Sequence, residues 1–165
     1  MSKMQPFWWF KKPAIVCPAG EQIVNGGFET GDFTGWIYNS SEVTNAQKHS
    51  GNYSCFLGIS PTEGYIEQDL AEPIAIECIQ SCGCFILPSV GDGALYFTIT
   101  YEDYTTNYRR YDFGQSGEWS YIDFMAFLNA EADLKKKIIH VAYSSTGLLG
   151  LKGFYVDDVS LVGKG

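Results

Sequence analysis

The sequence is poor in basic residues. Its 11 lysines and arginines stand against 19 aspartates and glutamates, which gives a formal net charge of −8 at neutral pH. Proteins bind a phosphate backbone through clusters of Lys and Arg, so this balance argues against a nucleic-acid partner. The one compact basic run, Lys135 to Lys137, follows the acidic stretch Glu131 to Asp133, a pattern typical of a solvated turn or helix end.

Long apolar runs are also lacking. No stretch approaches the roughly 20 apolar residues that a membrane-spanning helix needs, so we expect no membrane span. Near the start, the aromatic run Phe7 to Phe10 is followed by Lys11, Lys12 and Pro13, which interrupt it before a signal-peptide core of normal length is complete. We therefore find no clear export signal. Three possibilities stay open: the protein remains where it is made, it leaves the cell by lysis, or it is exported and its leader has been removed.

The common catalytic motifs are missing as well. The chain has only two histidines, His49 and His140, and it contains no nucleophile elbow, H-E-x-x-H pair, P-loop or dinucleotide-binding loop. Carboxylates such as Glu67 and Glu102 would supply a glycosidase pair only by chance, as in any acidic β-protein. We therefore predict a protein that is not an enzyme and has no catalytic residues. His140 is expected to be a sheet histidine that shares a face with Ile138 and Ala142.

The cysteines do not form a complete disulfide framework. Their number is five, so at least one thiol stays unpaired within a monomer. Cys78, Cys82 and Cys84 lie close together, but they lack the paired C-x-x-C knuckles of structural zinc sites. We interpret them as small buried residues of a strand, with one disulfide, and a thiolate metal site is the alternative.

What the sequence does contain is typical of a packed β-protein. Hydrophobic residues make up 45% and aromatic residues 16% of 165 positions, enough for one domain with a substantial core. From Glu21 onward, short apolar runs alternate with Gly, Asn, Asp and Ser turns. The sequence therefore predicts an all-β, antiparallel two-sheet β-sandwich over residues 21–165, preceded by an extended arm over residues 1–20.

The pattern predicts nine strands and at most one short helix. The segment from Leu95 to Tyr101 alternates clearly, with Leu95, Phe97, Ile99 and Tyr101 on one face. Only residues 124–134 have a pattern compatible with a helix. The predicted strands are residues 22–24, 53–58, 64–70, 82–87, 94–102, 107–113, 119–127, 137–144 and 153–162.

Three segments carry a resemblance to a known family. They are N-G-G-F-E-T-G at residues 25–31 with Gly35-Trp36, H-S-G-N-Y-S at 49–54, and F-Y-V-D-D-V-S-L at 154–161. In this order, with G-Y-I-E-Q-D-L at 64–70 between them, they resemble the signature of jelly-roll carbohydrate-binding modules found beside xylanases and glucanases. The resemblance implies a galactose-binding-like jelly roll in which Phe28 and Trp36 are core residues.

The same resemblance implies a structural calcium ion that ties the first loop to the last strand. Matching the motif position by position, Glu29 and Asp157 supply side-chain oxygens, and carbonyls near Gly27 and Lys48 complete the shell. Asp158 is the alternative to Asp157, since alternation along a strand sends only one of the two towards the loop. The other interpretation is that both aspartates end a strand in water.

The first functional hypothesis is glycan recognition by exposed aromatic and polar side chains. Sugar rings stack on Tyr and Trp, and their hydroxyls bind Arg, amide and carboxylate groups. The candidate ligand-binding residues are Tyr104, Tyr108, Arg110, Tyr111 and Trp119. Alternation sends Tyr108 and Arg110 to one face and Tyr111 to the other, so these residues cannot all meet one ligand. Core or edge packing is the alternative role for each aromatic residue.

The second hypothesis is a structural subunit, such as a virus capsid decoration protein or a surface filament subunit. Its interface would be Phe7, Trp8, Trp9 and Phe10, because exposed aromatic clusters are favoured anchors in protein interfaces. This hypothesis predicts a protein partner, a homo-oligomer or a larger assembly on a virion or an extracellular surface. The two hypotheses are compatible, because a surface protein can keep a sugar-binding face.

Overall fold

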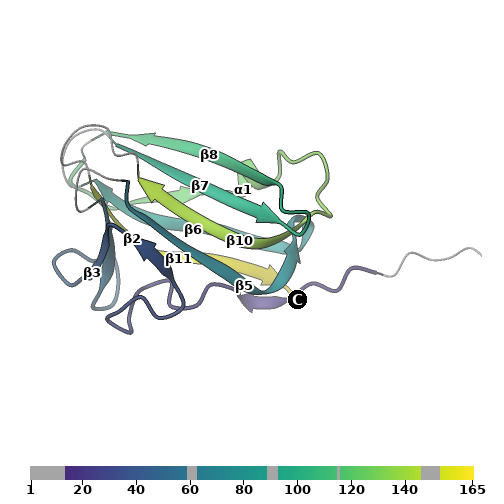
Figure 1. Ribbon diagram of the computed structural model, residues 1–165, viewed down its shortest axis with the longest axis horizontal. Helices are drawn as coiled ribbons and strands as arrows, with labels where there is room; N and C mark the ends of the chain where they lie inside the picture. The colour runs from purple at the N-terminus through teal and green to yellow at the C-terminus, as the bar shows by residue number, and fades with distance from the viewer. Residues whose placement is uncertain (1–13, 59–62, 89–92, 115, 146–152) are drawn as a thin grey trace, which may run out of the picture.

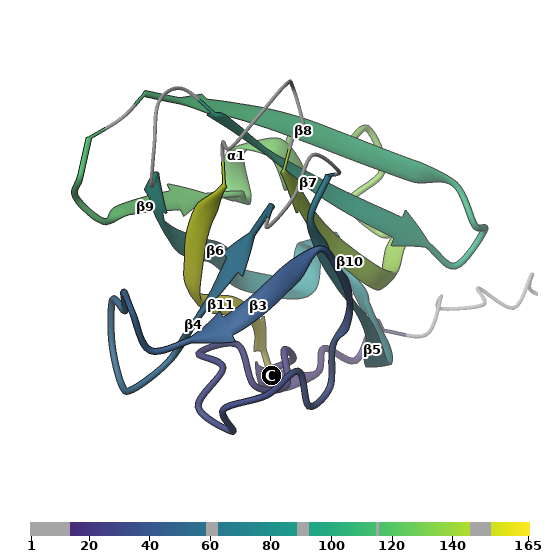
Figure 2. The same ribbon diagram turned by 60° about the vertical axis from the view of Figure 1, so that its left-hand side comes forward.

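Two antiparallel sheets packed face to face form the molecule (Figures 1 and 2). The computed structural model describes residues 14–58, 63–88, 93–114, 116–145 and 153–165. Strands dominate these ranges, and the helical elements are short. The prediction of an all-β, two-sheet sandwich is therefore confirmed.

The first sheet has five strands in the order β2-β5-β10-β7-β8. Its strands are β2 (Ile37–Asn39), β5 (Tyr65–Ala75), β10 (Lys137–Ser145), β7 (Gly93–Tyr101) and β8 (Thr106–Phe113). This sheet faces the viewer in Figure 1, with β8 at the top and β5 below. Its long central strands, β5, β10 and β7, provide the support on which a ligand-binding surface can be built.

The second sheet has six strands in the order β3-β4-β11-β6-β9, with β1 paired to β11 off this path. Its strands are β1 (Ala19–Glu21), β3 (Ser41–Thr44), β4 (Ser54–Leu57), β11 (Phe154–Lys164), β6 (Ile79–Pro88) and β9 (Ser120–Asp123). The short helical elements η1 (Ile76–Cys78) and α1 (Met125–Leu128) flank β6 and β9. Neither described helix is long and apolar enough to cross a membrane.

Aromatic side chains fill the space between the sheets. Phe97 of β7 is fully buried and stacks on Phe124 with ring centroids 4.1 Å apart. Tyr143 of β10 lies 5.2 Å from Phe97 and contacts Trp36 edge-on. Phe28 and Trp36 are buried beside them, as their place in the sequence signature predicts. The alternation predicted for β7 is confirmed, because its four inward residues are all buried.

A disulfide and three buried thiols account for the cysteines. Cys17 is bonded to Cys78, 61 residues away, so the segment before β1 is fixed to the end of η1, directly before β6. Cys55, Cys82 and Cys84 are free and buried, and desolvation raises the pKa of each thiol. The alternative of a thiolate metal site is wrong, because Cys78 is oxidised and the described residues contain no metal-binding group of cysteines.

Several sequence predictions need correction at the edges. The strand predicted at residues 22–24 is wrong: β1 lies three residues earlier, and Glu21 instead accepts hydrogen bonds from the N–H groups of Gln22 and Ile23. The edge strands β2 and β3 were missed, because they are only three and four residues long. Of the predicted arm, residues 17–20 lie against the sandwich through the disulfide and β1, and residues 14–16 are exposed, whereas Phe7, Trp8, Trp9 and Phe10 fall outside the described residues.

A β-bulge in β10 reverses one predicted side-chain direction. Between Ile138 and His140 the register of β10 shifts against both neighbouring strands. The pairing moves by one residue on β7, from Tyr101 to Thr100, and by five residues on β5, from Ile74 to Asp69. Ile138 is therefore buried in the core, while His140 and Ala142 point away from it. The prediction that His140 shares a face with Ile138 is wrong for this reason.

Replacing Phe97 tests the aromatic packing. We expect Phe97→Ala to lower the free energy of unfolding by about 3–5 kcal/mol, because it removes a fully buried ring from a packed cluster. Denaturant unfolding followed by near-UV circular dichroism measures this change. Tyr143→Phe is the matched control: its hydroxyl has no partner among the described residues, so its loss should be neutral or stabilising within about 1 kcal/mol. Equal losses in the two variants would contradict this account of the core.

Candidate functional site

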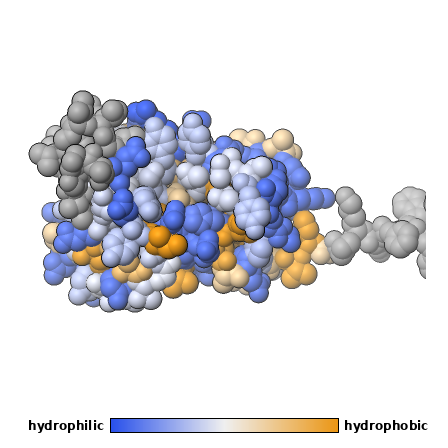
Figure 3. Space-filling view, viewed as in Figure 1, coloured by the Kyte–Doolittle hydropathy of each residue, from blue (hydrophilic) through white to orange (hydrophobic). Residues whose placement is uncertain are grey.

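The outer surface of the five-stranded sheet carries the polar and aromatic side chains that alternate with the core residues. We call this surface the open face. Figure 3 views it from the front and shows mostly hydrophilic and neutral side chains, with small separate hydrophobic patches. The pairing register places these side chains on it: Tyr65, Glu67 and Asp69 of β5, His140, Ala142 and Ser144 of β10, Tyr96, Thr98 and Thr100 of β7, and Thr106, Tyr108 and Arg110 of β8.

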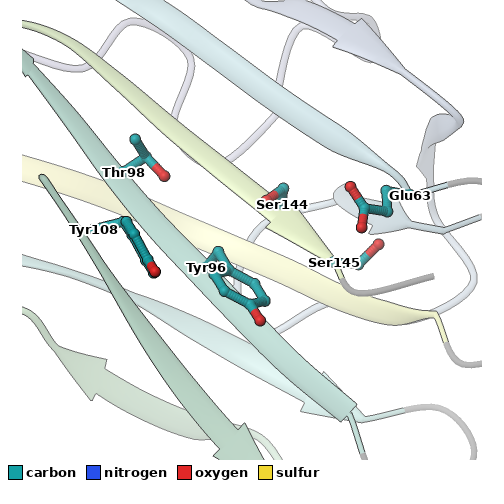
Figure 4. Close-up of a pocket in the computed structure, with 6 residues that line it drawn as sticks. All are labelled: Glu63, Tyr96, Thr98, Tyr108, Ser144 and Ser145. Atoms are coloured by element: carbon teal, nitrogen blue, oxygen red, sulfur yellow. The ribbon is translucent and has the colours of Figure 1, made fainter. Parts of the chain in front are cut away.

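A hollow of about 390 Å³ lies on the open face, and we call it the sheet hollow. Tyr96 and Tyr108 stand side by side on β7 and β8, with ring centroids 6.0 Å apart and planes inclined by 40° (Figure 4). Glu63, Ser144 and Ser145 lie across the end of β10 from these rings (Figure 4). The sheet hollow thus combines two tyrosine rings with hydroxyl and carboxylate groups. It is lined by Glu63, Tyr96, Thr98, Tyr108, Ser144 and Ser145.

Arg110 borders the sheet hollow and is held in place. Its guanidinium carbon lies 5.9 Å from the centroid of the Tyr96 ring. Its Nη2 and Nε atoms lie 2.6 and 2.8 Å from Asp112 Oδ1. Hydrogen bonding and charge attraction from Asp112 raise the pKa of Arg110, which therefore stays a cation. This contact leaves Arg110 as a positioned hydrogen-bond donor beside an aromatic face.

A histidine between two carboxylates occupies another part of the open face. His140 Nδ1 lies 2.8 Å from Asp69 Oδ1, and its Nε2 lies 3.6 Å from Glu67 Oε2. The β10 bulge is what turns His140 outward to meet these two β5 residues. The result is a polar patch of hydrogen-bonding groups on the same face as the tyrosine pair.

The five predicted ligand residues do not form one site. Tyr108 lines the sheet hollow and Arg110 borders it, but Tyr111 points inward and packs edge-on against Phe124 at 5.2 Å. Tyr104 lies in the turn between β7 and β8, with a positive φ of 60° and 82% of its surface exposed. Trp119 precedes β9 in the other sheet and contacts His49 edge-on at 5.8 Å.

Sequence reasoning missed Tyr96, Glu63 and the two serines. The signal for Tyr96 was available, because the alternation along residues 95–101 already placed it opposite the core residues. Glu63 and Ser144 belong to segments far apart in the sequence, and only the pairing of β5 with β10 brings them together. No local pattern could have identified them.

A second group of charged residues joins the first loop to the last strand. Glu29 Oε1 and Oε2 accept hydrogen bonds from the backbone N–H of Asn52 at 2.9 and 3.0 Å, and Oε1 also accepts one from Tyr53 at 3.1 Å. These backbone hydrogen bonds lower the pKa of Glu29. Gly51 is favoured here, because its φ of +55° is strained for other residues and a Cβ would displace the Glu29 carboxylate.

Asp157 is the buried member of this group. It has no exposed surface, and its carboxylate accepts hydrogen bonds from the backbone N–H of His49, Ser50 and Asp158 at 2.8, 3.1 and 2.7 Å. Desolvation nevertheless raises the pKa of Asp157, and the nearby Asp158 charge adds to the effect. Asp158 is partly exposed and contacts His49 Nδ1 at 2.7 Å. The two aspartates therefore have different surroundings.

The residues predicted to bind calcium lie close together. A Cβ on Gly27 would lie 3.5 Å from Asp158 Oδ1, 3.6 Å from Glu29 Cγ and 3.9 Å from Asp157 Oδ1. Lys48 directly precedes His49 in the facing turn. These donors are oxygens, which suit a hard cation. Within the described ranges, however, no three His, Cys, Asp or Glu side chains are arranged to hold a metal ion, so carbonyl groups would have to complete such a shell.

Solved structures with the same architecture are numerous. TmCBM61, a module solved in complex with β-1,4-galactotriose, matches with a TM-score of 0.59 at 20% sequence identity, covering 87% of this chain and 99% of that one. The chain has the jelly-roll fold of carbohydrate-binding modules. At this identity the likeness establishes the fold and leaves the ligand open.

Two further modules support the same jelly roll over nearly their whole length. A xylan-binding domain from Paenibacillus barcinonensis matches with a TM-score of 0.61 at 15% identity, covering 89% of this chain and 98% of that one. A family 11 module from Clostridium thermocellum, solved with a β-1,3-1,4-mixed-linked tetrasaccharide, gives 0.58 at 13% identity, with coverages of 88% and 97%. No family model and no curated protein matches the sequence.

The contacts of Glu29 predict a pH-dependent contribution to stability. Its pKa is lower in the folded than in the unfolded chain, so the stabilisation is complete above the unfolded pKa, about 4.3, and is lost as pH falls through the folded pKa. We expect Glu29→Gln to destabilise the protein at pH 7 by less than about 1 kcal/mol, because the carboxylate is solvent-exposed. Urea unfolding at several pH values measures the difference. Glu72→Gln, at another exposed glutamate, is the control; a Glu29→Gln difference that persists at low pH would contradict the assignment.

Proposed function

We propose that this chain is a non-catalytic binding module that recognises a glycan in the sheet hollow. The observation that carries the proposal is the pair of tyrosine rings, Tyr96 and Tyr108, set beside hydroxyl and carboxylate groups on a firm sheet. Fold likeness to modules solved with bound oligosaccharides supports the same assignment. The outer sheet surface, rather than a loop cluster, is the proposed binding surface.

The chemistry of the sheet hollow suits a sugar ring. A pyranose presents C–H groups on its faces, which pack on aromatic rings, and hydroxyls around its edge, which need hydrogen-bond partners. Tyr108 is 62% exposed and offers a ring for stacking, and Ser144 and Glu63 offer groups that bind hydroxyls. Arg110 adds a donor at the border. Because β8 and β10 hold Tyr108, Arg110 and Ser144, little ordering of these side chains is required on binding.

Binding without hydrolysis is supported by the distribution of carboxylates. Glycosidases place two carboxyl groups across the scissile bond, one on each side. Of the described residues that line the sheet hollow, Glu63 is the only one with a carboxylate. Glu67 and Asp69 lie elsewhere on the open face, where both contact His140. This distribution supports the proposal of binding without catalysis.

An assembly role would depend on Phe7, Trp8, Trp9 and Phe10, which lie outside the described residues. Nothing in the described residues favours a virion or filament function over glycan binding. The likeness to binding modules, in contrast, extends over most of the chain. Glycan binding is therefore the function that we put forward for experiment.

Replacing the tyrosines tests the proposed site. We expect Tyr108→Ala and Tyr96→Ala each to raise the dissociation constant at least about tenfold, or roughly 1.4 kcal/mol, through loss of ring stacking. Isothermal titration with β-1,4-galactotriose, xylohexaose and a β-1,3-1,4-mixed-linked tetrasaccharide measures the change.

The control is Tyr121→Ala, which removes a tyrosine of similar exposure, 50%, from the opposite sheet. It should leave binding unchanged. If Tyr121→Ala loses binding and Tyr108→Ala retains it, the site lies on the six-stranded sheet and the proposal is wrong. If the unmodified protein binds none of the three probes, glycan recognition is contradicted.

We also propose that Glu29 and Asp157, with carbonyls near Gly27 and Lys48, hold a structural calcium ion. The supporting observation is that Glu29 and both aspartates surround Gly27 in an oxygen-rich loop. A calcium ion that binds the folded chain and not the unfolded chain would stabilise the fold by about 2.7 kcal/mol at a calcium concentration 100 times the dissociation constant. Thermal unfolding with calcium or with chelator measures this gain. It should disappear in Glu29→Gln and persist in Glu72→Gln; identical melting curves with and without calcium would refute the proposal.

A further inference from the structure

A second hollow, of about 420 Å³, lies where the edges of the two sheets meet. We call it the edge hollow. β2 is the edge strand of the five-stranded sheet and β3 the edge strand of the six-stranded sheet, and they follow one another in the chain. None of its lining residues lines the sheet hollow. They are Gly31, Asp32, Phe33, Thr34, Tyr38, Ser41, Glu42 and Val43.

An aromatic pair forms the apolar part of the edge hollow. Phe33 and Tyr38 stack with ring centroids 3.8 Å apart and planes inclined by only 12°. Phe33 is half-buried and packs against the core, whereas Tyr38 keeps 52% of its surface exposed. One ring therefore supports the other from the protein side. Such a backed ring is a firm surface for the C–H face of a sugar.

The loop that carries Phe33 is fixed by one asparagine. Asn25 Nδ2 donates hydrogen bonds to Thr30 Oγ1 at 2.7 Å, to the Asp32 carbonyl at 3.1 Å and to the Thr34 carbonyl at 3.2 Å. The Asn25 carbonyl in turn accepts a hydrogen bond from Trp36 Nε1 at 3.1 Å. The loop is therefore anchored to a buried tryptophan, and its shape does not depend on a ligand.

Two carboxylates border the aromatic pair. Asp32 Oδ1 accepts hydrogen bonds from Thr30 Oγ1 at 2.8 Å and from the Thr34 N–H at 2.9 Å, which orient the group at the rim. Glu42 is exposed on β3, on the other side of the hollow. Carboxylates accept hydrogen bonds from sugar hydroxyls. No lysine or arginine is among the described lining residues, so the rim suits a neutral sugar and repels an anionic one.

We propose that the edge hollow is a second binding site that takes one pyranose unit of a neutral glycan, with Tyr38 as the stacking ring and Asp32 and Glu42 as hydroxyl acceptors. The inference goes beyond the proposed function, because it assigns a separate site with its own aromatic residue. It shares only the ligand class with the sheet hollow. A chain with both sites binds glycan on its face and at its edge.

Nuclear magnetic resonance titration of the full chain tests the second site. The probes are β-1,4-galactotriose, xylohexaose and the mixed-linked tetrasaccharide, followed by ¹H–¹⁵N spectra. We expect chemical-shift changes in residues 31–34 and 41–43 of the edge hollow. Their dissociation constant should differ from the one reported by residues 96–98 and 108–110 of the sheet hollow. Tyr38→Ala should weaken binding at the edge hollow at least tenfold and leave binding at the sheet hollow unchanged. Tyr108→Ala should weaken binding at the sheet hollow and leave the edge hollow unchanged. Tyr38→Phe should retain binding, which shows that the ring is sufficient for stacking.

The outcomes separate this inference from the proposed function. Chemical-shift changes confined to residues 96–98 and 108–110 would overturn the edge site and leave the sheet site standing. Changes in residues 31–34 and 41–43 that Tyr38→Ala does not weaken would do the same. If Tyr38→Ala abolishes all binding and Tyr108→Ala has no effect, the edge site is supported and the proposed site in the sheet hollow is contradicted. Tyr104→Ala controls for loss of an exposed tyrosine outside both hollows. Should Tyr38→Ala fail to fold by circular dichroism, Glu42→Lys tests the same hollow: unchanged binding of galactotriose there would overturn the proposal.

Discussion

The stacking of Phe97 on Phe124 is the contact on which the sandwich depends. Phe97 belongs to the five-stranded sheet, and Phe124 follows β9 of the six-stranded sheet, so their contact joins the two layers. Tyr143 packs against both rings, and Trp36 packs against Tyr143. Because these inward side chains fix the tilt and register of β7 and β10, they also fix the outward ones. The positions of Tyr96 and Ser144 on the open face are a consequence of packing on the other side.

The sequence predicted those features that follow from local pattern. Alternation along residues 95–101 identified the core face of β7, and alternation along β8 separated Tyr108 from Tyr111. Phe28 and Trp36 were placed in the core by the resemblance of their segment to jelly-roll modules. The predictions that failed depend on non-local pairing. The bulge before His140 and the short strands β2 and β3 arise from what lies opposite them, and no run of neighbouring residues reveals that.

The binding residues show the same limit. A dense run of aromatic and polar residues, from Tyr104 to Trp119, indicated a binding inventory, but the fold distributes it over a turn, two faces of β8 and the opposite sheet. The sheet hollow instead collects one or two residues from each of several strands. The loop from Asn25 to Trp36 is the exception. Its hydrogen bonds are local, and its signature in the sequence was recognisable for that reason.

The disulfide between Cys17 and Cys78 has a consequence for mechanical load. Ala19 of β1 pairs with Lys164 at the end of β11, so tension applied to the two flanks of the domain would peel this antiparallel ladder open one hydrogen bond at a time. Such peeling offers little resistance compared with shearing a whole ladder at once. Cys17 lies outside β1 and is joined to Cys78, the last residue of η1 directly before β6, so the bond transfers the force past β1 to a central strand. Ile79 at the start of β6 also pairs with Gly163 near the end of β11, so with the bond intact the load meets the longer β6–β11 ladder and not the three-residue β1.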